Sequence, residues 1–334
     1  MILNDEEKKM LEGEYGPGTQ RAMAFLKTLG EALEAERMVR VTSAHILPDM
    51  PTEYLEQMTA GLTRMRTMVS LMPCFDPVYW REKYGIVSKE KLIGGVGLTD
   101  EEDYAKNLAI LENLKVIPTF TCTPYTVGIV PRRSDVCIWS GTSGQNAANS
   151  MFGARAPRQS LPTSVASSIT GVAPYEGLMK PENRFAELLI ETKGLDPASF
   201  TPANFGALGY YIGKVAQTRN VVFNGLPPPR TIEECKYLTS PLTVDGACTM
   251  CHIVGVTPEA PTLEAALGGK EPRQVVNVTK KDLQDARDMF NTASPSQVKL
   301  AAFGCPHLTI IELRELAFLL EGKGLKEGAQ LYNC

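Results

Sequence analysis

The chain has 334 residues, of which 43% are hydrophobic and 22% charged, with a formal net charge of −4. This length can fill the core of one large domain or two ordinary ones, and the composition is that of a globular protein. A small negative charge without a basic stripe gives no reason to expect binding of nucleic acid. No apolar run is long enough to cross a bilayer, and the charged N-terminus lacks the apolar core of a signal peptide. We therefore expect a cytoplasmic protein without membrane contact.

The first part of the chain is predicted to be mainly helical, because apolar residues recur at helical spacing behind capping residues. The predicted elements are a helix over 5–12 capped by Asn4, a helix over 19–36, a strand at 39–41 and a helix over 52–70. The strand at 39–41 is expected to deliver His45 into a loop.

Two later stretches share one local order, in which a predicted helix is followed by a strand and then by a cysteine near a proline. The first consists of a helix at 107–114, a strand at 115–121 and Cys122; the second consists of a helix at 282–291, a strand at 298–304 and Cys305. In an α/β sheet the carboxyl ends of the strands face the ligand crevice. Thiols at these ends are expected to be metal ligands or nucleophiles, and the alternative is that they are buried core residues.

The alternation of helices and strands predicts an α/β fold with mostly parallel sheets flanked by helices. Capping boxes at 99–102 and 309–312 each predict the start of a helix. The proline run at 227–229 predicts a boundary between a region 1–230 and a second α/β subdomain 231–334. The strand-like residues that end the second subdomain have nothing after them to cover them, so this subdomain is expected to be incomplete at its C-terminus.

The chain contains eight cysteines and three histidines. In a reducing compartment the cysteines do not form a disulfide framework, and three histidines are too few for a histidine-rich metal site. The run Cys248-Thr-Met-Cys251-His252 matches the haem-attachment pattern, but that chemistry requires export. We interpret this run as a coincidence within a strand-like segment, with a zinc or redox role as the alternative.

The segment 141–168 is rich in Gly, Ser, Asn and Ala, which allows a ligand or another backbone to approach closely. Ser143, Asn146 and Asn149 could hydrogen-bond substrate oxygens there. The alternative for all three is helix capping and turn formation.

Charged residues near this segment are candidates for substrate contacts. Arg155 and Arg158 could hold a substrate carboxylate through the two-pronged geometry of the guanidinium group, or they could form surface salt bridges. His45 could act as a general acid or orient the substrate, with a structural histidine as the alternative. His307, beside Cys305, could tune a metal centre or cap its helix.

Several collinear motifs resemble the aconitase X family, a divergent branch of the aconitase superfamily. They cover nearly the whole chain and are Glu6–Gly16, Ser43-Ala-His45, Thr121–Tyr125, Trp139–Arg155, Ala207-Leu-Gly209, His252–Pro258 and Gly304-Cys-Pro-His307. The resemblance implies an aconitase-like fold with its cleft at the carboxyl ends of the strands. It also implies dehydration of a small hydroxy-carboxylate, and the known family activities include cis-3-hydroxy-L-proline dehydratase and phosphomevalonate dehydratase.

The resemblance further implies an iron–sulfur cluster, [4Fe-4S] or [2Fe-2S], in which three thiolates leave one iron open to act on the departing hydroxyl. Cys122 and Cys305 match two of the family's cluster cysteines. The third cysteine is expected beyond the point where this sequence ends. The small swivelling domain that completes the site in this superfamily is also absent here, so a separate small subunit is expected to supply it, including a catalytic serine.

Two motifs depart from the family pattern. Family members usually have Trp-x-Glu-Ser-Ser where this chain has Gly141 in the acidic position, and Thr-Asn-Arg-Glu-Gly where it has Ala156 and Gln159. A carboxylate is therefore missing from each motif, and carboxylates move protons in such sites. These changes support an alternative reading of the chain as a degenerate, non-catalytic subunit.

The leading hypothesis is a hydro-lyase large subunit acting on a substrate like cis-3-hydroxy-L-proline, with phosphomevalonate as the alternative. His45 and Ser143 would be catalytic, Cys122 and Cys305 would bind the cluster, and Asn146, Asn149, Arg155 and Arg158 would bind substrate. No dense basic cluster marks a phosphate pocket, although Arg132-Arg133 lie close to the motif. A third reading is a metal-free enzyme that uses Cys122 as its nucleophile.

Overall fold

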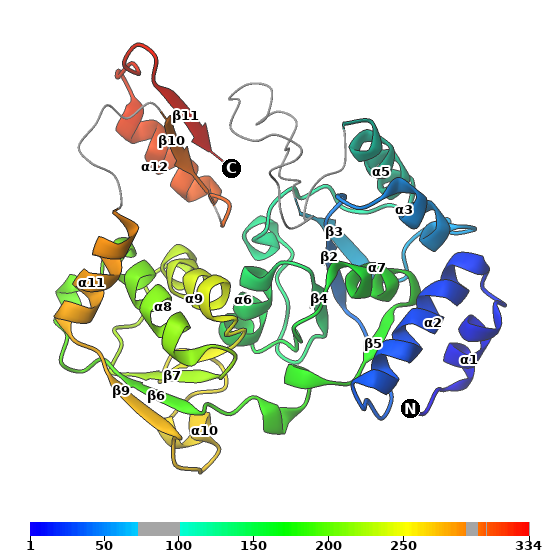
Figure 1. Ribbon diagram of the computed structural model, residues 1–334, viewed down its shortest axis with the longest axis horizontal. Coiled ribbons are helices and arrows are strands. Elements are labelled where there is room, and N and C mark those ends of the chain that lie inside the picture. Colours follow the sequence, from blue (N-terminus) through cyan, green and yellow to red (C-terminus); the bar gives the residue numbers. More distant parts are fainter. Residues whose placement is uncertain (73–100, 292–299, 305, 334) are drawn as a thin grey trace. The chain divides into compact units, whose positions relative to one another are not determined.

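The computed structural model describes residues 1–72, 101–291, 300–304 and 306–333. Its chain forms two compact units (Figure 1). The first unit consists of Met1–Pro124, Ser134–Gly141 and Ala154–Asn183, and the second of Tyr125–Arg133, Thr142–Gly153 and Arg184–Cys334.

The first unit packs helices around a small parallel sheet. Its helices are α1 (Asp5–Glu12), α2 (Pro17–Ala32), α3 (Thr52–Thr59), α5 (Glu101–Asn113) and α7 (Leu161–Thr170). Its strands are β1 (Met38–Arg40), β2 (Ser43–Ile46), β3 (Met68–Leu71), β4 (Cys137–Trp139) and β5 (Val172–Pro174). The parallel strands lie in the order β3-β2-β4, and β1 pairs with β5 in antiparallel fashion. Buried Leu26, Ile46, Leu111 and Ile169 join these helices and strands in one core.

The second unit is built on a four-stranded parallel sheet in the order β8-β7-β6-β9. Its strands are β6 (Leu188–Glu191), β7 (Val221–Asn224), β8 (Cys251–Ile253) and β9 (Gln274–Asn277). Its helices are α6 (Thr142–Phe152), α8 (Pro202–Ala216), α9 (Ile232–Gly246), α10 (Leu263–Leu267) and α11 (Lys280–Phe290). Figure 1 shows α8 and α9 over one face of this sheet and α10 on the other.

Alternation along the strands of the second unit explains this layering, because successive side chains of a strand point to opposite faces. Leu188 and Ile190 join the core formed with α8 and α9, whereas Leu189 between them joins the cluster that contains Leu267 of α10. Both faces of the sheet are therefore apolar, as parallel sheets require.

Helices α8 and α9 approach each other closely at glycines. A Cβ atom at Gly209 would lie 2.3 Å from the carbonyl oxygen of Leu238, and one at Gly246 would lie 2.0 Å from that of Gly213. No larger residue fits at these positions without moving backbone. The two helices are thus in backbone-to-backbone contact along part of their length.

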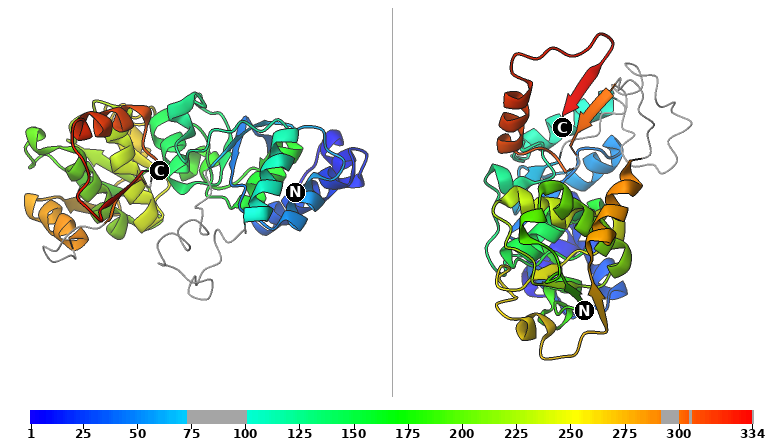
Figure 2. Two further views of the ribbon diagram at one scale, coloured as in Figure 1. Left: turned by 90° about the horizontal axis from the view of Figure 1, so that it is seen from above. Right: turned by 90° about the vertical axis from the view of Figure 1, so that its left-hand side faces the viewer.

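The last elements of the second unit are β10 (Leu300–Phe303), α12 (Ile310–Leu320) and β11 (Gln330–Asn333). Strands β10 and β11 pair in parallel, and they point the same way in the right-hand view of Figure 2. A buried ion pair connects α12 to α9, since Lys236 Nζ lies 2.5 Å from Glu312 Oε2.

The structure confirms the predicted α/β fold with mostly parallel sheets flanked by helices. The helix over 5–12 is confirmed with its Asn4 cap, and Thr309 and Glu312 form the predicted capping box at the start of α12. The box at 99–102 begins outside the described residues. None of the helices in the described ranges has the length and hydropathy needed to cross a membrane.

Other predicted elements differ from the structure. The helix over 52–70 is wrong beyond Thr59, because Gly61 adopts a positive φ of 81° that turns the chain into β3. The proline run at 227–229 lies inside the second unit, between β7 and α9.

Candidate active site and family

His45 lies inside β2, between strands on both sides. It pairs with Ser70 of β3 and Trp139 of β4, and its carbonyl oxygen accepts a hydrogen bond from the Ser140 backbone N–H at 2.9 Å. The expectation that His45 sits in a loop is therefore wrong. All four residues of β2 are buried, and Ser43, Ala44 and His45 pair on both edges, which makes β2 the central strand of this sheet.

The surroundings of His45 are tightly packed. Its side chain is fully buried, and its ring meets that of Trp139 edge-on, with ring centroids 6.2 Å apart. Trp139 Nε1 in turn donates to Ser43 Oγ at 3.0 Å. The imidazole is thus held in one orientation near the carboxyl end of the sheet.

Cys122 follows a segment that runs along β3 to the carboxyl end of the same sheet. Only Ile117 of the predicted strand at 115–121 bridges to β3, because the Thr119 N–H turns back and donates to the Ile117 carbonyl oxygen at 2.9 Å. Thr119 Oγ1 then donates to the carbonyl oxygen of Leu71, the last residue of β3, at 2.8 Å. Cys122 follows three residues after Thr119. The segment that leads to Cys122 therefore lies beside β3, and β3 is the neighbour of β2, which contains His45.

The loop around Cys122 is braced by the threonines on either side of it. Thr121 and Thr123 are buried, their hydroxyls lie 3.0 Å apart, and the Thr123 N–H donates to Thr121 Oγ1 at 3.2 Å. Cys122 between them is partly exposed. This arrangement presents one accessible thiol on a fixed loop; Cys305 lies outside the described residues.

Other thiols lie in apolar surroundings that disfavour ionisation. Cys137 and Cys248 are fully buried, and burial raises the pKa of each thiol to about 12. Burial also raises the pKa of Cys235 to about 11 and that of Cys251 well above its usual range. Since the thiolate is the metal ligand and nucleophile, Cys122 is better suited to that chemistry than these four.

Gly141, at the end of β4, stands where the family pattern has an acidic residue. A Cβ atom there would lie 3.2 Å from Met72 Sδ. The space next to this position is therefore occupied by the flexible end of a methionine side chain.

Arg155 and Arg158 belong to the first unit, on the segment that leaves α6. Arg155 bridges in parallel to Val136, just before β4 begins, which places its backbone at the amino end of this strand. Its side chain is half-buried, whereas that of Arg158 is exposed. Gln159 follows directly and donates from Nε2 to Glu176 Oε1 at 2.5 Å.

Ser143, Asn146 and Asn149 belong to the second unit, in α6. Ser143 is half-buried in the first turn, whereas both asparagines are almost completely buried. Asn146 Nδ2 donates to the carbonyl oxygen of Cys248 at 2.8 Å, and Asn149 Nδ2 donates to that of Thr249 at 3.1 Å. The two amides thus fasten α6 to the segment that precedes β8.

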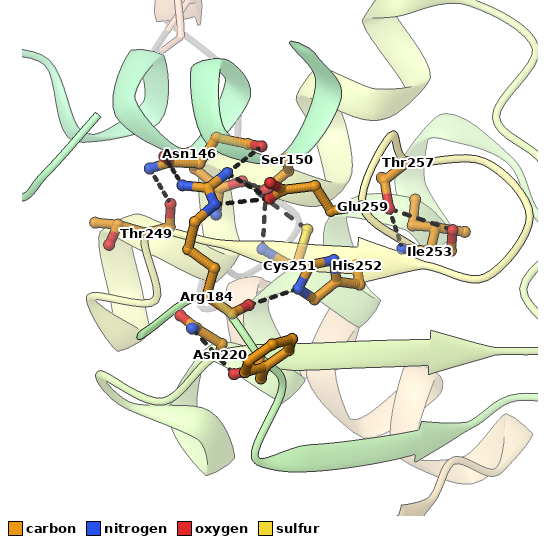
Figure 3. Close-up of polar contacts among 12 residues, drawn as sticks. Asn146, Ser150, Arg184, Asn220, Thr249, Cys251, His252, Ile253, Thr257 and Glu259 are labelled. Atoms are coloured by element: carbon orange, nitrogen blue, oxygen red, sulfur yellow. Dashed lines mark hydrogen bonds and ion pairs between the residues drawn. The ribbon is translucent and has the colours of Figure 1, made fainter. Parts of the chain in front are cut away.

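Arg184 is the centre of a buried polar network that sequence reasoning missed (Figure 3). Its guanidinium group donates from Nη1 to Asn149 Oδ1 at 2.9 Å and from Nε to Glu259 Oε2 at 2.7 Å. Its carbonyl oxygen lies 2.8 Å from His252 Nε2, which must donate this bond because a carbonyl can only accept. Single arginine and glutamate residues 75 positions apart give no sequence signal for this pairing.

The haem-like run lies in the interior of the second unit. Cys248, Cys251 and His252 are buried, and burial lowers the pKa of His252 below its usual range. Only the end of the haem-like run lies in a strand, since Cys251–Ile253 form β8 and Cys248 precedes this strand. Within the described part of the chain no three candidate metal ligands gather into one group.

The motifs at these positions match known proteins over the whole chain. The profile for the aconitase X first domain matches residues 1–182, and the profile for the aconitase X second domain matches residues 186–288. The phosphomevalonate dehydratase large subunit of Thermococcus kodakarensis is 31% identical, over 97% of this chain and 78% of that protein. The cis-3-hydroxy-L-proline dehydratase of Hypocrea jecorina is 29% identical, over 96% of this chain and 53% of that protein.

A solved structure agrees with these relatives. The crystal structure of Thermococcus kodakaraensis aconitase X in its holo-form matches with a TM-score of 0.82 and 29% identity, over 100% of this chain and 81% of that one. The chain belongs to the aconitase X family, whose named relatives are dehydratases, that is, hydro-lyases.

Proposed function

We propose that this chain is the large subunit of a dehydratase that removes water from a small hydroxy-carboxylate. The observation that carries the proposal is the carboxyl end of the β3-β2-β4 sheet. There the accessible thiol of Cys122 follows the segment beside β3, and the buried imidazole of His45 lies within β2, in a chain of this family. In the reaction a C–O and a C–H bond break, a C=C bond forms, and the hydroxyl leaves with a proton as water.

Cys122 and Cys305 are the proposed ligands of an iron–sulfur cluster. Cys122 fits this role because it is accessible on a braced loop, whereas Cys137 and Cys248 are fully buried. A bound cluster would supply a Lewis acid for the departing hydroxyl.

The remaining residues are proposed to bind and orient the substrate. Arg155 and Arg158 would hold its carboxylate, since a guanidinium group can donate two parallel hydrogen bonds. Ser143 and His45 would take part in proton movement, and His45 is held for this in one orientation by its packing against Trp139.

Asn146 and Asn149 are proposed to support substrate binding by fixing the position of α6. Their amide groups donate to Cys248 and Thr249 carbonyl oxygens, which fixes the helix that carries Ser143. A loss of either amide should then misplace Ser143 as well as weaken the unit.

Two substrates are candidates. The sequence favours a cis-3-hydroxy-L-proline-like compound, because no dense basic cluster marks a phosphate pocket. Phosphomevalonate is favoured by a different observation, since the large subunits named for it match this chain over about four fifths of their length (78–81%). That name also supports the proposal of a separate small subunit as partner.

The test is to co-purify the chain anaerobically with the small subunit of a phosphomevalonate dehydratase and to count bound iron and acid-labile sulfide. Each candidate substrate is then offered, and loss of one water is followed by mass spectrometry. Cys122→Ala should abolish iron binding, whereas Cys235→Ala should retain it. Iron binding without turnover of either substrate would favour the degenerate-subunit reading, and turnover without iron would favour the thiol nucleophile.

A further inference from the structure

The first unit contains a cavity of about 590 Å³ at the amino ends of two neighbouring strands. One wall is formed by residues 40–42, directly before β2, and the other by residues 64–68, which lead into β3. Cys122 follows the opposite end of β3, and none of the described residues proposed for dehydration lines this cavity. The volume lies within the range of roughly 300–1,000 Å³ that is typical of small-molecule sites.

Three arginines line this cavity, namely Arg40, Arg64 and Arg66. Arg40 and Arg64 are exposed, and neither guanidinium group has an ion pair or a hydrogen bond within the described part of the chain. Arg66 differs from them, because its Nη1 donates to Glu6 Oε1 at 2.9 Å. Two positively charged groups, one on each wall, are therefore available to a ligand.

The two walls are fixed to each other by Thr67. Its Oγ1 lies 3.0 Å from the carbonyl oxygen of Val41 and 2.9 Å from that of Thr42, so its hydroxyl can donate to either. The backbone N–H of Arg66 donates to the carbonyl oxygen of Ser168 at 2.9 Å, which fastens the second wall to the end of α7. The segments that carry the arginines thus hold their positions without a ligand, which lowers the entropy cost of binding one.

The charges around the cavity favour an anion with more than one negative charge. Two carboxylates lie close to the walls without lining the cavity: Glu6 is paired with Arg66, and Asp135 accepts from Thr42 Oγ1 at 3.5 Å. A guanidinium group binds a carboxylate or a phosphate through two parallel hydrogen bonds. Two unpaired guanidinium groups therefore match a ligand with two such faces, either one phosphate or two carboxylates.

We propose that this cavity binds a small dianion whose charge lies on oxygen, and that Arg40 and Arg64 hold it from opposite walls. The dianion is a phosphate group or a dicarboxylate, which share this chemistry. The site goes beyond the proposed dehydration, because it lies at the amino ends of β2 and β3 and uses other residues. A bound dianion would cross-link the segments that lead into these two strands.

The test titrates the full chain with inorganic phosphate, succinate or acetate by calorimetry in low salt. The titrations are made at about pH 8, where carboxylates are ionised and phosphate is mostly a dianion. The preferred dianion should bind about tenfold or more tightly than acetate, because only a dianion satisfies both guanidinium groups. Arg40→Gln and Arg64→Gln each remove one of these groups and should lower the affinity about three- to tenfold.

Arg314→Gln is the matched control. Arg314 is also exposed and lacks an ion pair within the described ranges, but it belongs to the second unit. Its substitution should leave the affinities unchanged. Glu6→Gln should have the opposite effect, because it releases Arg66 and so raises the affinity for the dianion. Damage to the fold would not produce such a rise.

A second readout locates the bound anion without any variant. The preferred dianion should slow modification of Arg40 and Arg64 by phenylglyoxal, as followed by peptide mapping, and leave Arg314 and Arg158 reactive. Stronger binding of phosphate than of succinate would identify a phosphorylated molecule as the ligand, and the reverse order a dicarboxylate; either result supports the site.

The proposal is overturned if neither dianion binds more tightly than acetate. It is also overturned if Arg40→Gln and Arg64→Gln bind the dianion as well as Arg314→Gln does. Protection of Arg158 in place of Arg40 and Arg64 would likewise overturn it, since the anion would then lie at the proposed dehydration site.

Discussion

Gln159 donates a hydrogen bond of 2.5 Å to Glu176, at the position where the family pattern has a glutamate instead of a glutamine. Burial raises the pKa of Glu176 above its usual range, and the bond from Gln159 lowers it only in part. A carboxylate is therefore present beside this position, although it comes from a different part of the chain.

Gln159→Glu should make stability depend more steeply on pH. Because the folded-state pKa of Glu176 is raised, its contribution is fully present below the unfolded pKa and is lost as pH rises through the folded pKa. A second carboxyl would raise that pKa further, and we expect a loss of about 1–3 kcal/mol at neutral pH but little in acid. Urea unfolding at about pH 4 and about pH 8 measures this. Adding Glu176→Gln to the variant should remove the effect, and an equal loss at both pH values would contradict it.

Gly141→Glu, combined with Gln159→Glu, would restore both family carboxylates. A Cβ atom at position 141 meets only the flexible end of Met72, so we expect the protein still to fold. If these carboxylates move protons, kcat with the preferred substrate should rise about tenfold or more. Gly141→Gln has similar bulk without the charge and serves as control. Equal turnover in wild type and the restored variant would show that the departures do not limit activity.

Lys236→Met should strongly destabilise the contact between α9 and α12. The side chains of Lys236 and Glu312 are 1% and 6% exposed, and removal of one partner leaves a buried charge. We expect a loss of about 3–5 kcal/mol by denaturant unfolding. The double variant Lys236→Met/Glu312→Leu should recover most of this loss. The prediction would be contradicted if Lys236→Met alone were at least as stable as the double variant.

Titration of Glu312 should also make the stability of the contact between α9 and α12 depend on pH in acid. Burial raises its pKa, but hydrogen bonds from Lys236, Tyr237 and the Thr309 backbone, together with the charge of Lys236, outweigh burial and hold the pKa below its usual range. A depressed folded-state pKa gives stability above the unfolded pKa that is lost as pH falls through the folded pKa. Below about pH 4 the wild type should lose stability faster than Glu312→Gln, as measured by unfolding across that range.

Arg184→Lys should destabilise the second unit by about 2–4 kcal/mol, because a lysine cannot replace the contacts of the guanidinium group with both Asn149 and Glu259. Thermal unfolding checks this. Arg158→Lys, at an exposed side chain, should change stability by less than about 0.5 kcal/mol and serves as control. Comparable effects of the two substitutions would argue against the network.

Alkylation of the native protein should separate the described cysteines into two groups. Cys122 and Cys235 are partly exposed and should react, with Cys235 slower because of its raised pKa. Cys137, Cys248 and Cys251 are fully buried and should react only after unfolding. Peptide mapping by mass spectrometry measures each site. Native modification of Cys251 would show that β8 opens.

Local signals predicted much of the fold. The capping box at Thr309 and the cap at Asn4 involve residues three apart, so they can be read directly from the sequence. The strand before Cys122 was predicted too long, because apolar periodicity does not show that the Thr119 N–H turns back to the Ile117 carbonyl oxygen. Patterns of apolar residues could not reveal that His45 lies in a central strand, since that depends on two partners far along the chain.

The long-range polar contacts could not be predicted from the sequence for a related reason. Glu176 is 17 residues from Gln159, Glu259 is 75 from Arg184, and Glu312 is 76 from Lys236. Each pair consists of common residues without a fixed spacing. Only the folded chain brings them together. The proposed roles of the site residues came from the resemblance to a family, because composition does not indicate them.

The glycine contacts between α8 and α9 have a mechanical consequence. With Gly209 against Leu238 and Gly246 against Gly213, neither helix can slide or rotate past the other without a clash of main-chain atoms. We therefore expect the two helices to move together, so that a displacement of one also displaces the other.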